Sequence, residues 1–114
     1  NQTLIMTYFN RGTSYNRLEE YEKGINDYSK AIELNPDFVE AYYYRGNAYI
    51  KLREYAKALV DYNAAIAINP NYQNAINNRK MLLEEHPELK PQSSSSKSGG
   101  APACLVCISS WAII

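Results

Sequence analysis

The sequence predicts an all-α solenoid, in which antiparallel helix pairs stack in a row. Three observations lead to this fold class: an internal repeat that relates residues 5–38 to residues 39–72, apolar residues at three- and four-residue steps, and an Asn-Pro break at the end of each repeat. A fixed repeat of this length is typical of units that bury their apolar faces only against their neighbours. We therefore expect stability to come from stacking of the units, without one central core.

The repeat appears when the first of these segments is laid over the second. Residues 5–38 then match residues 39–72 at fourteen positions. These positions hold aromatic, small and charged residues alike, so the two segments are predicted to form the same structure twice. The fourteen pairs are Tyr8/Tyr42, Arg11/Arg45, Gly12/Gly46, Tyr15/Tyr49, Leu18/Leu52, Glu20/Glu54, Tyr21/Tyr55, Lys23/Lys57, Asp27/Asp61, Tyr28/Tyr62, Ala31/Ala65, Ile32/Ile66, Asn35/Asn69 and Pro36/Pro70.

The helix boundaries are predicted from the spacing of apolar residues and from residues that break helices. Apolar and small residues recur at helical spacing, not at the two-residue spacing of a strand. Each Asn-Pro pair ends a helix, because proline lacks an N–H and disfavours helix in the residue before it. Short polar segments at 17–20 and 52–54 predict a turn inside each repeat. The predicted helices are Leu4–Arg17, Tyr21–Leu34, Phe38–Leu52, Tyr55–Ile68 and Tyr72–Glu85, with His86-Pro87 ending the last.

Small residues mark where the helices of a pair should cross. Gly12 and Gly46 lie near the middle of the first helix of each repeat, and Gly24 and Ala58 lie early in the second. A residue without bulk lets two backbones approach closely. Gly24 is an unexpected choice there, since glycine inside a helix costs about 1 kcal/mol relative to alanine.

This pattern resembles the tetratricopeptide repeat. That family has a large aromatic residue, a small residue four positions later, then Tyr, Ala, an aromatic, Ala and Pro. Two complete repeats cover residues 5–72, with Tyr in place of the usual Trp, Arg in place of a usual Leu, and Gly24 in place of Ala. The resemblance implies an extended surface that binds other proteins. The residues that carry it are Tyr8, Gly12, Tyr15, Gly24, Tyr28, Ala31 and Pro36, then Tyr42, Gly46, Tyr49, Ala58, Tyr62, Ala65 and Pro70.

A third unit begins after residue 72 and then departs from the pattern. Ile76, Arg79 and Leu83 keep the phase of the repeat, but Lys80 stands where glycine should be. Lysine there would block a closely packed partner helix, so residues 72–86 are predicted to form a capping helix. An interrupted third repeat is the alternative. The repeat domain is therefore assigned to residues 1–89.

The residues after 89 have a different composition. Residues 90–100 are rich in Ser and Gly and predict a flexible linker, and the disordered tail continues as an apolar segment at 101–114. That segment is shorter than the roughly 20 apolar residues of a membrane span. We assign it no role, although it could reach back to occupy a groove. Because the chain starts at Asn1 without a visible signal peptide, we expect a fragment of a cytoplasmic protein.

Composition and motifs argue against several classes of function. Twelve basic and twelve acidic residues balance, so no net field would gather nucleic acid or an anionic membrane. Cys104 and Cys107 form a single pair, and His86 is the only histidine, which is too few ligands for a zinc site. No residues suggest a nucleophile, a base and a stabiliser together. We expect no enzyme activity, no cofactor and no metal.

The predicted binding surface lies on the first helix of each unit, at positions that the core does not claim. Asparagine amides there could pair with the backbone of an extended peptide, since an amide both donates and accepts hydrogen bonds. Aromatic residues beside them would supply contact area. Solvated, functionless asparagines are the alternative. The candidate groove residues are Phe9, Asn10, Thr13, Arg17, Tyr43, Tyr44, Asn47, Lys51, Asn77, Asn78 and Met81.

Some relatives of this family bind the C-terminal carboxylate of chaperones through lysines, asparagines and an arginine. The matching positions here carry no positive charge, and a desolvated carboxylate needs charged partners. This argues against a carboxylate clamp, unless Arg17 and Lys51 substitute from another direction, and leaves a chaperone-linked adaptor without the clamp as an alternative. The positions are Phe9, Thr13, Tyr44, Asn74 and Asn78.

Two further features have competing interpretations. Arg11, Arg45 and Arg79 recur with the repeat, and we favour structural pairing with Asp or Glu over a ladder of anion contacts. Two repeats are fewer than the three usually needed for a stable stack, so the chain could form a homodimer as a structural repeat. Met81 and Leu82 on the last helix are the surface predicted for that self-association.

Overall fold

The computed structural model describes residues 2–90, which form five α-helices and no strand. One short 3-10 helix follows them. The predicted all-α class is confirmed. The predicted linker from residue 91 onward and the apolar segment at 101–114, with Cys104 and Cys107, lie outside the described residues, and so does Asn1. The helices are α1 (Gln2–Arg17), α2 (Tyr21–Leu34), α3 (Val39–Lys51), α4 (Tyr55–Ile68) and α5 (Gln73–Glu85), followed by η1 (Pro87–Leu89).

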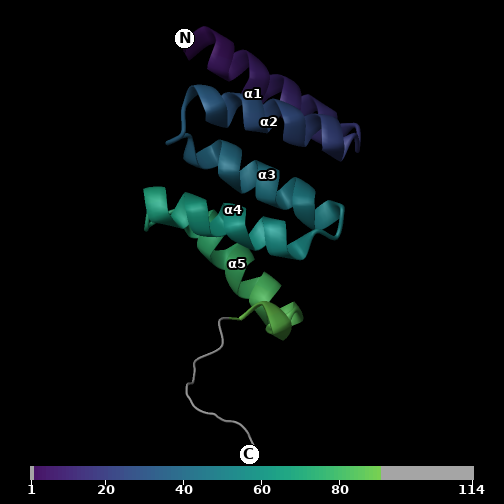
Figure 1. The fold of residues 1–114 in the computed structure, drawn as a ribbon, viewed down its shortest axis with the longest axis vertical. Helices are drawn as coiled ribbons and strands as arrows, with labels where there is room; N and C mark the ends of the chain where they lie inside the picture. The colour runs from purple at the N-terminus through teal and green to yellow at the C-terminus, as the bar shows by residue number, and fades with distance from the viewer. Residues whose placement is uncertain (1, 91–114) are drawn as a thin grey trace, which may run out of the picture.

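The helices stack in chain order, each against the next, as a short solenoid (Figure 1). The molecule is elongated, with extents of 58 × 25 × 22 Å. Neighbouring helices run in opposite directions because the connections between them are short. No helix of residues 2–90 is both long enough and apolar enough to cross a membrane.

The connections between repeats begin with an asparagine side chain that caps the turn. Asn35 Oδ1 accepts a hydrogen bond from the Asp37 N–H at 3.2 Å, and Asn69 Oδ1 accepts one from the Asn71 N–H at 3.1 Å. Such local bonds favour turns over helix. Phe38 is therefore the N-cap of α3. The helix begins at Val39, one residue later than predicted.

The turn inside each repeat contains a non-glycine residue with a positive φ angle, which the sequence does not predict. Glu19 and Arg53 have φ angles of 63° and 62°, in the left-handed region. Just after them, the N–H groups of Glu20 and Glu54 reach back to the carbonyls of Tyr15 and Tyr49, both at 2.9 Å. This arrangement ends a helix abruptly and usually has glycine at the left-handed position.

The predicted crossing points bring backbones close together. A Cβ atom added to Gly12 would lie 3.0 Å from the Tyr28 ring, and one added to Gly46 would lie 2.9 Å from the Tyr62 ring. Both tyrosines are fully buried. Gly24 is also buried, and its neighbour is the Gly12 carbonyl oxygen, 3.0 Å from where a Cβ would stand. The pairing of α1 with α2 and α3 with α4 therefore depends on these small residues.

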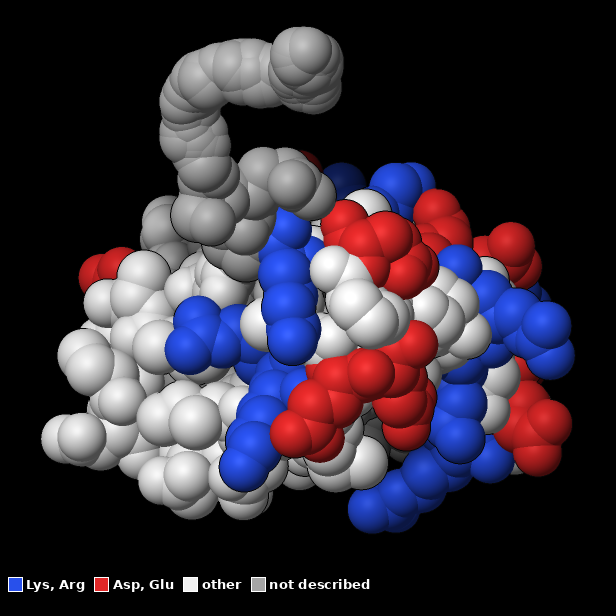
Figure 2. All heavy atoms as spheres, turned by 90° about the horizontal axis from the view of Figure 1, so that it is seen from below, with Lys and Arg blue, Asp and Glu red and all other residues white. Residues whose placement is uncertain are grey.

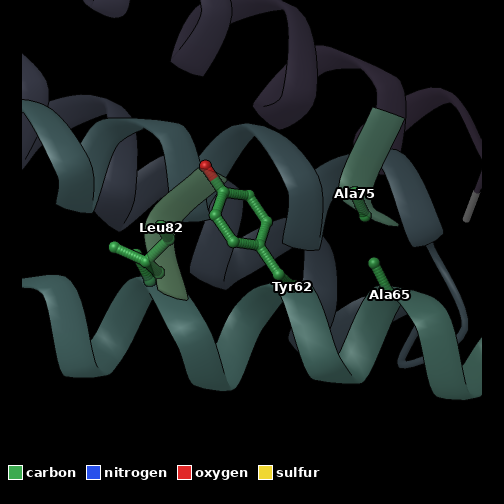
Figure 3. Close-up of a cluster of buried hydrophobic side chains, with 5 residues drawn as sticks. Tyr62, Ala65, Ala75 and Leu82 are labelled. Carbon is green, nitrogen blue, oxygen red and sulfur yellow. The ribbon is translucent and has the colours of Figure 1, made fainter. Parts of the chain in front are cut away.

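The packing of α5 corrects one prediction. Figure 3 shows Tyr62 and Ala65 of α4 beside Ala75 and Leu82 of α5. Leu82 is only 4% exposed, so it is part of the core and cannot form the predicted surface for self-association. Met81, the other residue of that surface, is 56% exposed. The prediction about Leu82 was wrong because α5 rotates it onto α4.

Candidate binding groove

Two neighbouring cavities follow the row of α1, α3 and α5, which is the row predicted to bind a partner. One cavity, of about 330 Å³, lies between α1 and α3, and the other, of about 300 Å³, lies between α3 and α5. Asn47 and Lys51 of α3 line both. We call the two cavities together the groove, and name them the first and the second cavity in chain order.

Most of the predicted site residues line this groove. The first cavity contains Thr13, Arg17 and Tyr44, and the second contains Asn78 and Met81. Phe9 and Tyr43 line neither cavity, although both pack against Tyr44 of the first one. Asn10 and Asn77 are exposed outside both cavities. Asn77 accepts a hydrogen bond from the Gln73 side chain at 3.1 Å.

An amide pair lies where the two cavities meet. Asn47 Oδ1 accepts hydrogen bonds from the Tyr62 hydroxyl at 2.5 Å and from Asn78 Nδ2 at 2.9 Å. Asn78 Nδ2 also lies 3.3 Å from the Tyr43 hydroxyl. Within residues 2–90, Asn47 Nδ2 and Asn78 Oδ1 have no hydrogen-bond partner. The pair therefore has an unused amide donor on Asn47 and an unused carbonyl acceptor on Asn78.

Tyr62 positions this amide pair through its hydroxyl group. Its ring is buried in the core between α4 and α5, while its hydroxyl reaches the groove wall. Burial raises the pKa of Tyr62 to about 12, because the phenolate would be poorly solvated there. Tyr62 therefore keeps its proton, and donates it to Asn47, to a more alkaline pH than an exposed tyrosine would.

Aromatic rings continue from the first cavity toward the turn before α3. Phe9 packs against Phe38 with ring centroids 4.8 Å apart and against Tyr44 at 5.7 Å. Tyr43 packs against Tyr44 at 5.1 Å and against Tyr72 at 5.6 Å. These distances are those of ordinary aromatic pairs. Phe9 and Tyr43 thus stabilise contacts between units, and Tyr44, 37% exposed, is the ring that a ligand can reach.

The groove carries positive charge at its centre. Arg17 and Lys51 both line the first cavity, and neither has an ion-pair partner among the described residues. Glu85 lines the far end of the second cavity. The positions of the carboxylate clamp that were compared above hold neutral residues, so the cations of this groove come from Arg17 and Lys51. Unpaired cations favour an acidic group in the ligand.

The second helices contribute residues that the sequence analysis missed. Tyr21 lines the first cavity, and Tyr55 lines the second. Each is the first residue of its helix and one of the matched repeat positions, which was the available signal. Ile50 and Leu82 add apolar surface to the second cavity, and Asn16 lines the first. The groove floor therefore belongs partly to α2 and α4.

The arginine row is structural in the two complete repeats, as favoured from the sequence. Arg11 donates from Nε and Nη2 to the two carboxylate oxygens of Asp27, at 2.7 and 2.8 Å. Arg45 holds Asp61 with the same atoms, at 2.8 and 2.7 Å. Burial raises the pKa of Asp61 and the Arg45 guanidinium opposes that rise. Arg79 has no such carboxylate and donates to Asn63 Oδ1 at 2.9 Å.

His86 has a structural contact. Its ring stacks on Tyr55 with centroids 3.9 Å apart, and Glu88 lies 3.4 Å from its Nδ1. In the part of the chain that the structure describes, no three His, Cys, Asp or Glu side chains are grouped as metal ligands would be.

Family models and solved structures match this chain. A model described as "TPR repeat" matches residues 12–53, and one described as "Tetratricopeptide repeat" matches residues 39–72. Together these matches span more than half of the chain, from residue 12 to residue 72. A comparison with curated proteins found no match.

Three solved structures show the same fold. The first TPR of Spaghetti (RPAP3), bound to the HSP90 peptide SRMEEVD, has a TM-score of 0.71 at 25% identity, over 74% of this chain and 67% of that one. The Arabidopsis OM64 TPR domain has a TM-score of 0.69 at 27% identity, over 74% and 69%. MamA has a TM-score of 0.72 at 27% identity, over 78% of this chain and 52% of its own.

Proposed function

Because this chain belongs to the tetratricopeptide repeat family, we propose that it is a protein-interaction module that holds an extended segment of a partner protein in the groove. It would act as an adaptor or scaffold element within a larger assembly. The observation that carries this proposal is the amide pair of Asn47 and Asn78. Its unused donor belongs to Asn47, which lines both cavities, and its unused acceptor belongs to Asn78 in the second cavity, and such a donor and acceptor suit the C=O and N–H groups of a peptide backbone.

The two cavities differ in the side chains that they would accept. The second cavity is lined by Ile50, Tyr55 and Met81, which suits an apolar side chain. The first cavity places Arg17 and Lys51 beside Tyr44, which suits an acidic side chain. We therefore propose a partner segment with an apolar residue and an acidic residue near each other, joined by backbone that crosses the amide pair.

The test compares two asparagines, one inside and one outside the groove. Peptides selected by display on the whole chain serve as probes, and their affinities are measured by fluorescence anisotropy. Asn47→Ala should weaken binding by about 1–3 kcal/mol, because it removes a donor and leaves the Tyr62 hydroxyl and Asn78 without their acceptor. Asn77→Ala is the matched control, since Asn77 lies outside both cavities. Equal affinities of the two variants would contradict the proposal.

A chaperone tail is the second candidate, because the RPAP3 domain that shares this fold is bound to an HSP90 peptide. The peptide SRMEEVD is therefore a useful probe. We expect it to bind weakly here, since none of the positions that match the carboxylate clamp carries a positive charge. Tight binding that Arg17→Gln or Lys51→Gln abolishes would favour the chaperone-linked adaptor.

A further inference from the structure

The row of residues that α1 and α3 pack against the helix after them is only partly buried in α5, where Lys80 is exposed and Ile76, Arg79 and Leu83 are half-buried. Ile76, Arg79, Lys80 and Leu83 of α5 lie one repeat length after Tyr42, Arg45, Gly46 and Tyr49 of α3. In α3, the tyrosines of that row pack against the core cluster that α4 helps to build, and the arginine binds Asp61 of α4. Among the described residues, only the short 3-10 helix η1 follows α5, and no α-helix packs on the corresponding row. We call these four residues of α5 the end face.

Arg45 shows what this row does when a helix covers it. Its Nε and Nη2 bind the two oxygens of Asp61, and its Nη1 donates to Ser29 Oγ at 3.0 Å in the preceding repeat. Arg11 also uses Nε and Nη2 for its aspartate, Asp27. The same two nitrogens therefore bind the following helix in both complete repeats, and Nη1 binds backward.

Arg79 keeps the backward contact and lacks the forward one. Its Nη1 donates to Asn63 Oδ1 at 2.9 Å, and Asn63 is the repeat equivalent of Ser29. Within residues 2–90, no carboxylate lies within ion-pair distance of Arg79. The guanidinium is thus held from one side, with Nε and Nη2 left for a bidentate carboxylate.

Lys80 changes which helix can bind. A Cβ atom on Gly46 would already stand 2.9 Å from the Tyr62 ring. Because Lys80 takes the Gly46 position in α5, a helix that packs there has no room for a tyrosine after its aspartate. It also adds an exposed positive charge at the residue after Arg79. A second carboxylate, placed where α4 carries Tyr62, would meet that charge. Figure 2 looks at this end of the stack and shows basic and acidic side chains at the surface beside a broad uncharged area.

We propose that the end face binds an amphipathic helix of a partner protein, which presents two adjacent carboxylates to Arg79 and Lys80 and apolar residues to Ile76 and Leu83. The first carboxylate takes the place that Asp61 has on Arg45. The second replaces the tyrosine that Lys80 excludes. This surface is separate from the groove, so the module binds two partner segments at once.

The charges of this chain argue against its own segments as the occupant. Residues 91–114 and helix α1 contain no Asp or Glu, so neither the tail nor the opposite end of a second copy offers a carboxylate. Two end faces that met with the symmetry axis at Arg79 and Lys80 would bring like charges against each other. A partner with its own acidic helix avoids both problems.

The test uses a stapled peptide as the probe and the whole chain as the receptor. The peptide has the sequence of residues 55–68 with Tyr62→Glu, so that it carries the adjacent acids on a helix. Two control peptides separate the contacts: one also carries Asp61→Asn, and one keeps tyrosine at position 62. Both controls should bind about tenfold more weakly, because each lacks one of the two carboxylates.

Protein variants then locate the peptide. Arg79→Gln should weaken binding about tenfold, while Arg53→Gln, an exposed arginine in a turn, and Arg17→Gln, in the first cavity of the groove, should have no effect. In NMR spectra, the Arg79 Nε–Hε signal should become protected on binding, as those of Arg11 and Arg45 are beforehand. Circular dichroism confirms that each variant is folded.

Several results would overturn the proposal. These are no binding of the peptide at millimolar concentration, equal binding by Arg79→Gln, or loss of binding in Arg17→Gln, which would place the peptide in the groove. Sedimentation of the whole chain is the remaining measurement. A dimer that Arg79→Gln dissociates would show that a second copy, and not a partner helix, occupies the end face.

Discussion

Gly24 shows how one residue sets the distance between two helices. Its missing Cβ would stand 2.3 Å from Asn16 Oδ1 and 3.0 Å from the Gly12 carbonyl oxygen. Asn16 Oδ1 is buried without a hydrogen-bond partner in the described structure. In the second repeat, Ile50 replaces this asparagine and Ala58 replaces the glycine. The Asn16 side chain of α1 therefore occupies space that is open only because residue 24 of α2 is glycine.

We predict that Gly24→Ala lowers the free energy of unfolding by about 1–2 kcal/mol, since overpacking outweighs the gain in helix propensity. In an Asn16→Ala background the same substitution should be neutral or stabilising, because the amide no longer occupies the space. Urea unfolding of the four proteins in a double-mutant cycle measures this coupling. Additive effects would mean that the Gly12 carbonyl alone limits the approach.

Tyr62 makes stability depend on alkaline pH. Its pKa is about 12 in the folded chain and 10 in an unfolded one, so the folded state holds its proton more tightly. The stabilisation is complete below pH 10 and is lost as the pH rises from 10 to 12, because only the unfolded state gains by ionisation there.

The loss attributable to Tyr62 should be on the order of 2 kcal/mol. Urea unfolding of the natural sequence and of Tyr62→Phe is measured between pH 9 and about pH 12. The difference between the two proteins gives the contribution of Tyr62, since they share all other tyrosines. A variant with the same decline as the natural sequence would show that Tyr62 is not its source.

At the scale of the element, each repeat turns at a residue that strains the backbone. Glu19 and Arg53 have positive φ angles, which favour glycine. Glu19→Gly and Arg53→Gly should each raise the free energy of unfolding by about 0.5–1 kcal/mol, measured by thermal or urea unfolding. Leu18→Gly, beside Glu19 but without a positive φ, is the control and should not stabilise.

The two Arg–Asp pairs link the helices of each repeat with unequal strength. The Arg11 side chain is 56% exposed, whereas that of Arg45 is 19% exposed. Asp61→Asn should therefore cost about 2–4 kcal/mol, because it leaves a mostly buried guanidinium without its charge partner. Asp27→Asn should cost less, since water solvates Arg11. Equal losses in urea unfolding would show that burial does not set the value of these pairs.

Much of the structure of these helices could be predicted from the sequence, because the residues that define it are close together in the chain and occur in both repeats. Proline breaks and apolar spacing place the helix ends within one or two residues, and small residues at Gly12 and Gly46 mark the crossings. The left-handed turn at Arg53 could not be predicted, since no glycine announces it. The burial of Leu82 depends on how α5 rotates against α4, which spacing alone does not define.

The groove was predicted only in part for the same reason. Arg17, Lys51 and Met81 follow from their places on the first helices. The contact of Asn47 with Asn78, by contrast, joins residues in different repeats, and depends on the angle between stacked units. Tyr21 and Tyr55 enter from the second helices, a contribution that the positions of the first helices do not suggest.

At the scale of the whole molecule, stability should decrease toward α5. Helix α5 contacts α4 on one side through Ala75 and Leu82 and is followed among the described residues only by the short helix η1, while α3 packs against both α2 and α4. Stacked repeats couple mainly to their nearest neighbours, so an end helix opens alone.

Native-state hydrogen exchange followed by NMR should therefore find the fastest helical exchange in α5 and the slowest in α3 and α4. Addition of the acidic stapled peptide should slow exchange in α5. Uniform protection along the array would instead indicate that the described chain unfolds as one cooperative unit.

The backward contact of each arginine has a consequence for length. Arg45 and Arg79 both find a side-chain oxygen in the unit before them, from Ser29 and Asn63. A tandem copy of residues 39–72 inserted after Tyr72 would supply its own arginine, its own aspartate and a fresh Asn for the next unit. The array can thus be extended by whole modules, and each added module would lengthen the surface on which a ligand rests.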